Sequence, residues 1–170
     1  MRYVIIVSLV LACAGRATPA ARSDDAAHGA GHHLWKTYTN VRFQYAICYP
    51  EDLLQPQGES ANGDGEKFLA RDGAQLIVYG SNNALDDTLK HTLGETASRL
   101  AGASGKVTYK VLRSNWFVVS GRNRQAIFYV KTFYSHDQFK SFELTYGRAD
   151  AGSFDPLIGH LTSCFADLAR

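Results

Sequence analysis

The sequence lacks a long apolar run, since its most hydrophobic stretch, residues 4–12, is bounded by charged and small residues. A helix needs about 20 apolar residues to span a bilayer, so this stretch excludes a permanent membrane span at that place. A positive charge before it and small residues after it are typical of a secretory signal peptide. Cleavage fits the small-x-small rule after Ala14 and after Ala20. We predict that residues 1–20 are removed.

A cysteine inside this segment leaves a second outcome open. Residues 10–13, Val-Leu-Ala-Cys, resemble the sequence at which bacterial lipoproteins are cut and acylated, with Leu11 where a smaller residue is usual. A lipid anchor at Cys13 is therefore the alternative to simple cleavage. In both cases we expect the mature protein outside the cytosol, either periplasmic or secreted.

Cysteine is scarce, with three residues in the whole chain. Once Cys13 is removed or acylated, Cys48 and Cys164 remain in an oxidising compartment, which predicts one disulfide between them. Closing so long a loop would stabilise the fold by about 4 to 5 kcal/mol on the chain-entropy model. The alternative is two separate buried thiols.

Net charge is also nearly absent from the mature chain. Removal of residues 1–20 takes away Arg2 and Arg16 and no acid, which leaves equal numbers of basic and acidic side chains. The distribution is uneven, because residues 51–95 hold nine acids whereas residues 96–136 hold none. The acid-free stretch carries Arg99, Lys106, Lys110, Arg113, Arg122, Arg124 and Lys131. Either these cations gather on one surface, or the acidic half folds over them and neutralises them.

Residues 21–33 lack apolar periodicity and predict a flexible linker before a single domain over 34–170. Alternating side chains predict strands at 41–49, 66–70, 75–80, 106–113, 116–120, 126–134 and 140–146. Apolar residues at helical spacing predict helices over 83–100 and 155–168. Asp86 and Asp87 would lie in the first turn of one helix, and Asp155 would cap the other.

These elements predict an α+β fold, with an antiparallel sheet of about six to seven strands flanked by two main helices. The Asp72-Gly73 pair predicts a hairpin turn between two of the strands. The disulfide would attach the last helix to the first strand. No internal repeat and no second domain are evident.

One strand carries a family resemblance. Its pattern of aromatic, small and β-branched residues before Tyr-Pro reads Phe43-Gln44-Tyr45-Ala46-Ile47-Cys48-Tyr49-Pro50. It resembles the opening strand of the PsbP-like fold family, which includes photosystem II extrinsic proteins and bacterial envelope proteins, and residues 157–165 are similar to that family's terminal helix. The resemblance covers residues 41–168. It implies an α/β/α sandwich and a binding or assembly role rather than catalysis.

Catalytic motifs are missing. No Gly-x-Ser-x-Gly elbow occurs, and the paired carboxylates are neighbours in sequence, which do not face each other on a helix or strand. Ser120 and His136 could approach across one predicted hairpin as hydroxyl and base, although turn residues need no chemistry to explain them. Glu143 is expected on the solvent side of its strand. We predict a protein that is not an enzyme.

Metal-binding patterns are weak as well. Asn62, Asp64 and Glu66 have the alternate spacing of a calcium loop, but its twelfth position would be Gly73, so a glycine-rich turn is the preferred interpretation. His28, His32 and His33 would form a loose site at best. We predict no metal and no cofactor.

The basic tract is the leading candidate site. Its predicted turn and next strand supply the binding residues, which are Ser120, Gly121, Arg122, Arg124 and Lys131. Aromatic side chains are interleaved with them, namely Tyr109, Trp116, Tyr129, Phe133 and Tyr134. A basic surface attracts an anionic partner, and an exported neutral domain disfavours nucleic acid.

We therefore predict a non-catalytic exported binding or accessory protein with a protein or anionic envelope partner. The first alternative is a periplasmic inhibitor of a lysozyme-like cell-wall hydrolase, in which a Ser120-Gly121 loop with Arg122 and Arg124 enters the enzyme cleft. The second alternative is a hydrolase.

Overall fold

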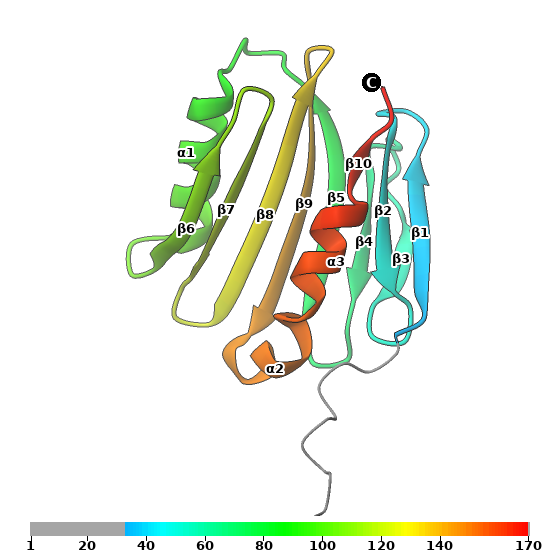
Figure 1. The fold of residues 1–170 in the computed structure, drawn as a ribbon, viewed down its shortest axis with the longest axis vertical. Helices are drawn as coiled ribbons and strands as arrows, with labels where there is room; N and C mark the ends of the chain where they lie inside the picture. The colour runs from blue at the N-terminus through cyan, green and yellow to red at the C-terminus, as the bar shows by residue number, and fades with distance from the viewer. Residues whose placement is uncertain (1–32, 170) are drawn as a thin grey trace, which may run out of the picture.

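Two antiparallel sheets make up the computed structural model, which describes residues 33–169 (Figure 1). The larger sheet has seven strands, in the order β3 (Gln55–Glu59), β4 (Gly65–Leu69), β5 (Gln75–Asn82), β9 (Gln138–Gly147), β8 (Ala126–Ser135), β7 (Trp116–Arg122) and β6 (Lys106–Leu112). The smaller sheet has the order β1 (Trp35–Asn40), β2 (Tyr45–Pro50) and β10 (Ala166–Asp167). The predicted signal peptide, Cys13 and nearly all of the predicted linker lie outside the described residues.

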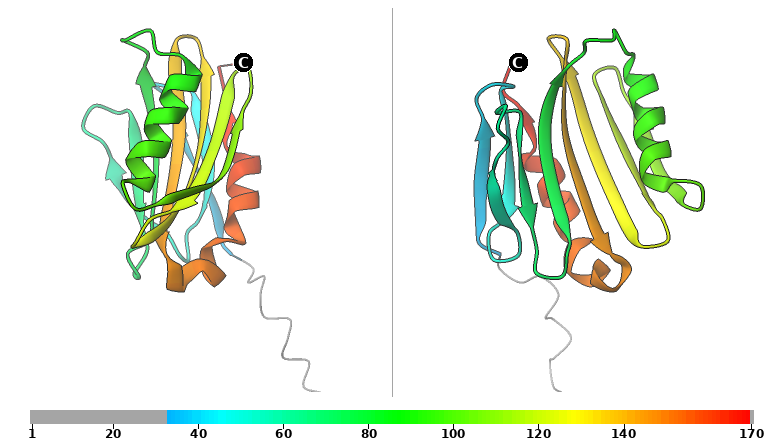
Figure 2. Two further views of the ribbon diagram at one scale, coloured as in Figure 1. Left: turned by 90° about the vertical axis from the view of Figure 1, so that its left-hand side faces the viewer. Right: turned by 180° about the vertical axis from the view of Figure 1, so that it is seen from behind.

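Helices lie on both sides of the larger sheet. Helix α1 (Leu89–Ala101) packs on β6 and β7, whereas α3 (Leu157–Cys164) lies on the opposite face beside the smaller sheet (Figure 2). A 3-10 turn, η1 (Arg148–Asp150), and the short helix α2 (Ala151–Phe154) connect β9 to α3. The predicted α+β fold with helices flanking an antiparallel sheet is confirmed. Among the described residues, no helix is long and apolar enough to cross a membrane.

Alternation along the strands divides the core into two parts. On β8, Phe128 and Val130 pack under α1, whereas Tyr129 and Phe133 pack toward α3. The larger cluster fills the space between the two sheets and α3, and it includes Tyr45, Phe68, Phe142, Leu161 and Phe165. The strand period of two thus sends neighbouring residues of the basic tract to opposite faces of one sheet.

The first predicted strand is wrong at its start. Residues 41–44 form a turn between β1 and β2, with Gln44 in the left-handed region at φ 52°. The fully buried Asn40 holds this turn, because its side chain accepts a hydrogen bond from the N–H of Phe43 at 2.8 Å and donates to Glu59 at 3.0 Å. Strands β1 and β3 were not predicted, whereas the hairpin at Gly73 is confirmed.

Both predicted helices are shorter in the structure. Helix α1 begins at Leu89, because the Asn83 side chain accepts a hydrogen bond from the N–H of Asp87 and so keeps the preceding residues in a turn. The Thr88 hydroxyl caps the helix, because it accepts a hydrogen bond from the N–H of His91 at 3.2 Å. Asp155 does not cap the last helix, since its carboxylate accepts a hydrogen bond from the Tyr146 hydroxyl. The chain leaves that helix after Cys164 to form β10.

Covalent and ionic contacts attach the smaller sheet and α3 to the rest of the domain. The predicted disulfide is present between Cys48 of β2 and Cys164 at the end of α3, with the two Cα atoms 5.8 Å apart and 116 residues between them in sequence. Lys140 of β9 forms an ion pair with Asp167 of β10, and neither side chain is exposed. The disulfide therefore attaches α3 to the smaller sheet, and the ion pair attaches β10 to the larger sheet.

Candidate functional site

The acid-free stretch builds one end of the larger sheet, strands β6, β7 and β8 (Figure 1). Its strand register places Lys106 opposite Arg122, and Ser120 between Tyr109 and Tyr129. These side chains share the face that is opposite α1. We call this surface the basic-aromatic face, and it comprises Lys106, Tyr109, Ser120, Arg122, Tyr129 and Lys131. In Figure 1 it is the near side of β6 to β8, beside α3.

Most of the predicted cations are not neutralised by acids within residues 33–169. Lys106, Lys110, Arg122 and Arg124 are exposed, and none of them forms an ion pair with a described acid. Lys106 and Arg122 are direct cross-strand neighbours. Like charges in that position destabilise a sheet, so an anion bound between them would be stabilising. The acidic half of the chain does not cover these four cations.

Arg99 differs from these four cations, because it lies in α1 and forms an ion pair with an acid. Its guanidinium lies 2.7 Å from the carboxylate of Glu143. Glu143 was predicted to be solvent-exposed, but it is only 7% exposed. Its side chain points toward α1 rather than to open solvent, so the prediction is wrong, and Arg99 compensates the charge.

Tyrosines give the face an amphipathic character. Tyr109 is 55% exposed on the edge strand β6. Tyr129 is half-buried, and burial raises the pKa of its hydroxyl, which accepts a hydrogen bond from Thr162 at 3.2 Å. Val118, directly opposite Lys131 in the strand register, is buried on the same face. Tyrosine and arginine with apolar neighbours are typical of protein interfaces.

Lys131 has a structural contact in addition to its place on the face. Its ammonium donates a hydrogen bond to the carbonyl of Thr162 at 2.8 Å, in the last turn of α3. It also lies 4.7 Å from the centre of the Phe133 ring. A lysine at the C-terminal end of a helix is favourable for the helix dipole. Lys131 therefore fixes α3 beside the face.

Ser120, Gly121 and Arg122 all belong to β7, which corrects the prediction of a turn that begins after Ser120 and of a Ser120-Gly121 loop. Gly121 faces α1, where an added Cβ would come within 2.4 Å of the Lys106 carbonyl oxygen. The turn consists of residues 123–125 and is fixed by the Asn123 side chain, which accepts hydrogen bonds from Gln125 and Ala126 at 2.9 Å. Of the five predicted binding residues, only Arg124 is in it. A Ser-Gly loop that enters an enzyme cleft is not formed.

The suggested Ser120 and His136 pair is not formed either. Ser120 is opposite Tyr129 in the register, whereas His136 lies in the turn beyond the far end of β8. Seven residues of strand correspond to more than about 20 Å. The hydroxyl and the imidazole are therefore out of reach of each other.

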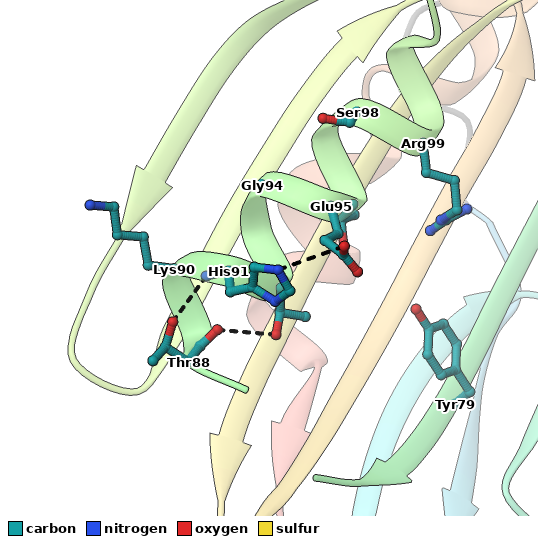
Figure 3. Close-up of a pocket in the computed structure, with 10 residues that line it drawn as sticks. Tyr79, Thr88, Lys90, His91, Gly94, Glu95, Ser98 and Arg99 are labelled. Atoms are coloured by element: carbon teal, nitrogen blue, oxygen red, sulfur yellow. Dashed lines mark hydrogen bonds and ion pairs between the residues drawn. The ribbon is translucent and has the colours of Figure 1, made fainter. Parts of the chain in front are cut away.

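A hollow of about 860 Å³ lies between α1 and β5 (Figure 3). Figure 3 shows Tyr79 of β5 and Arg99 of α1 on two sides of it. His91 is 2.9 Å from Asp87, just before α1, and 3.7 Å from Glu95 of α1, so both of these charged neighbours are acids. Because Arg99 and His91 already have acidic partners, this hollow has less unpaired charge than the basic-aromatic face.

The predicted metal patterns have internal explanations. The carboxylate of Asp64 accepts hydrogen bonds from Ser60 at 2.5 Å and Asn62 at 2.8 Å. The hydrogen bond from Ser60 is the main reason that the pKa of Asp64 is lowered. His33 lies 2.8 Å from Asp52, and His28 and His32 lie outside the described residues. Asn62 and Asp64 therefore shape a turn.

Comparison with known proteins supports the fold. No protein-family model and no curated protein sequence matches the chain. Among solved structures, it is similar to the solution structure of cyanobacterial PsbP (CyanoP) from Synechocystis sp. PCC 6803, with a TM-score of 0.60 and 15% identity, over 82% of this chain and 95% of that chain. At this identity the likeness concerns the fold and not the function. The chain has a PsbP-like fold, as the motif at residues 43–50 predicted.

Proposed function

We propose that the protein is a non-catalytic, exported binding or accessory protein whose basic-aromatic face docks on a partner protein with an acidic surface. The observation that carries the proposal is the cross-strand pair Lys106 and Arg122, exposed and without an acidic partner in residues 33–169. Repulsion between these two charges destabilises the sheet of the isolated protein, and an acidic partner would relieve that repulsion.

Two features support export. Residues 1–20 have the pattern of a signal peptide. The Cys48–Cys164 disulfide is typical of proteins that fold outside the reducing cytosol.

The form of the face favours a protein partner over a small ligand. Its side chains are spread over three strands of a sheet, and a row with two tyrosines separates the Lys106–Arg122 pair from Lys131. Tyrosine and arginine supply much of the binding energy in protein interfaces, while unpaired charges on the rim accelerate association. Exposed charges are screened by salt, so the proposed complex would weaken as ionic strength rises.

Charge reversal tests the proposal. The tagged mature protein and its Arg122→Glu/Arg124→Glu variant are used to recover partners from the envelope fraction of the native organism at low salt. Wild type should recover an acidic protein that is released at higher salt, and the variant should lose it. The recovered protein is then purified, and its affinity for both forms is measured directly.

The control is Lys67→Glu/Lys90→Glu, which makes the same change of net charge on exposed residues of β4 and α1. It should retain the partner. Equal loss in both double variants would mean that only net charge matters, and unchanged binding by Arg122→Glu/Arg124→Glu would exclude the face. If the mature protein bound anionic lipid vesicles and recovered no partner protein, the proposal would also be contradicted.

A further inference from the structure

Three metal-binding side chains meet where α3 contacts β2. They are Cys48 of β2 and His160 and Cys164 of α3, and their ligand atoms all lie within 4.8 Å of one another. His160 and Cys164 are four residues apart on a helix, which places them on the same side of it. In the structure the two sulfurs form the disulfide, so neither is a thiolate.

We propose that reduction of this disulfide converts the cluster into a Zn²⁺ site with two thiolates and one imidazole. A dithiol reductant would transfer two electrons and two protons to the sulfurs and become a disulfide itself. Both thiols would then lose their protons as the metal binds. Thiolate and imidazole are preferred zinc ligands, and three protein ligands leave a fourth position for water.

The ligands are held in place by contacts other than the sulfur–sulfur bond. Strand β2 is paired on one side by β1 and on the other by β10, which directly follows α3. The ring of Trp35 lies 3.9 Å from the ring of His160, between centroids, and orients the imidazole. Because the backbone of β2 and α3 is fixed in this way, reduction would leave the three ligands close together.

The site would also be accessible to an ion. His160 is exposed and Cys164 is partly exposed, whereas Cys48 is only 6% exposed. An ion could thus enter from the side of the imidazole and reach a sulfur that is shielded from bulk solvent. A partly buried site of this kind strengthens the attraction between Zn²⁺ and the thiolates.

Metal titration tests the inference. The mature protein is reduced with dithiothreitol, desalted without oxygen and titrated with Co²⁺ as a spectroscopic substitute for Zn²⁺. The reduced protein should bind one Co²⁺ per chain, with a thiolate-to-cobalt charge-transfer band in the near ultraviolet that Zn²⁺ abolishes. The oxidised protein should show no such band.

Variants identify the imidazole ligand. His160→Ala should weaken Zn²⁺ binding in a chelator competition by more than about tenfold, since even outer-shell partners of zinc contribute that much. His136→Asn, in the exposed turn between β8 and β9, is the control and should bind normally. Equal affinity of His160→Ala and wild type, or no cobalt band in reduced wild type, would overturn the inference.

Circular dichroism provides a second measurement of Zn²⁺ binding if the reduced chain unfolds. In that case, recovery of the sheet signal on addition of Zn²⁺ would support the site, because metal binding would then be coupled to folding. A reduced chain that stays unfolded with Zn²⁺ would overturn the inference.

Discussion

Gly121 lies where the backbone of β6 comes close to β7, on the side of the sheet that α1 covers. An added Cβ there would be 2.4 Å from the carbonyl oxygen of Lys106 and 2.6 Å from the Phe128 ring. Both neighbours are held in the sheet, one as backbone and the other as a buried side chain. The absence of a side chain at Gly121 thus allows Lys106 and Arg122 to be neighbours on the opposite face.

Substitution of this glycine should be costly. We expect Gly121→Ala to lower the free energy of unfolding by about 1–3 kcal/mol through overpacking, measured by urea denaturation. The matched control is Gly94→Ala in α1, where no atom other than the helix's own nearby backbone lies within 4 Å of the added Cβ. Alanine is the better helix former, so the control should be neutral or stabilising by up to about 1 kcal/mol. Equal effects of the two substitutions would contradict the close packing at Gly121.

At the scale of elements, β10 depends on a buried ion pair. Asp167 is bound by Lys140 of β9 and accepts a second hydrogen bond from Ser135 at 2.5 Å. Burial alone would raise the pKa of Asp167, but these hydrogen bonds outweigh it and hold the pKa below its ordinary value. The carboxylate therefore stabilises the fold above the pKa of the unfolded chain, near 4, and this contribution is lost as the pH falls below it.

This coupling predicts the effect of Asp167→Asn. At pH 7 the variant should be less stable than wild type by about 3–5 kcal/mol, because Lys140 would remain buried without its partner. The difference should narrow as the pH falls below about 4, because the unfolded chain then takes up a proton at Asp167 while the folded carboxylate, with its lowered pKa, remains ionised. Urea denaturation from pH 7 to pH 3 measures it.

The control for the ion pair is Asp72→Asn, in the exposed hairpin turn. Its side-chain oxygen accepts a hydrogen bond from Ala74 at 2.9 Å, which an asparagine oxygen can also accept. It should change stability little at any pH. A difference between Asp167→Asn and wild type that stays constant down to pH 3 would show that the ion pair does not stabilise the fold.

The strands that the sequence predicted well are those with one face buried. Strands β6 to β9 alternate clearly, and all four were predicted. Strand β3 was missed because all five of its residues are exposed and include Pro56 and Gly58, which favour a turn. The start of α1 was placed too early, since only the structure reveals that the Asn83 side chain competes for the N–H of Asp87.

Part of the candidate site was predictable for the same reason. Adjacent strands without an acid bring their cations to one end of the sheet, where the structure has Lys131 in β8 and Arg122 in β7, although Arg122 was expected in the following turn. The orientation of Gly121 was not predictable, because β7 continues two residues beyond the expected end, and a side chain in a strand faces the opposite side from its neighbour. The contact of Lys131 with α3 depends on tertiary packing.

At the scale of the molecule, the larger sheet is covered unevenly. Helix α1 covers β6 and β7 on one side, and the smaller sheet with α3 covers the other side only as far as β8 (Figures 1 and 2). The uncovered part carries Lys106 and Arg122, which form no ion pair with an acid in residues 33–169. Uneven coverage and unpaired charge coincide on the basic-aromatic face, and the proposed function rests on this coincidence.

Site-specific photo-crosslinking in intact cells of the native organism tests this claim most directly. A benzophenone amino acid is placed at Tyr109 on the face or at Lys90 on α1, both of which are exposed, and the adducts are identified by mass spectrometry. We predict one acidic protein crosslinked at position 109, absent at position 90, and lost when Arg122→Glu is added. No adduct at position 109, or an adduct that is equal at both positions or insensitive to Arg122→Glu, would contradict the account.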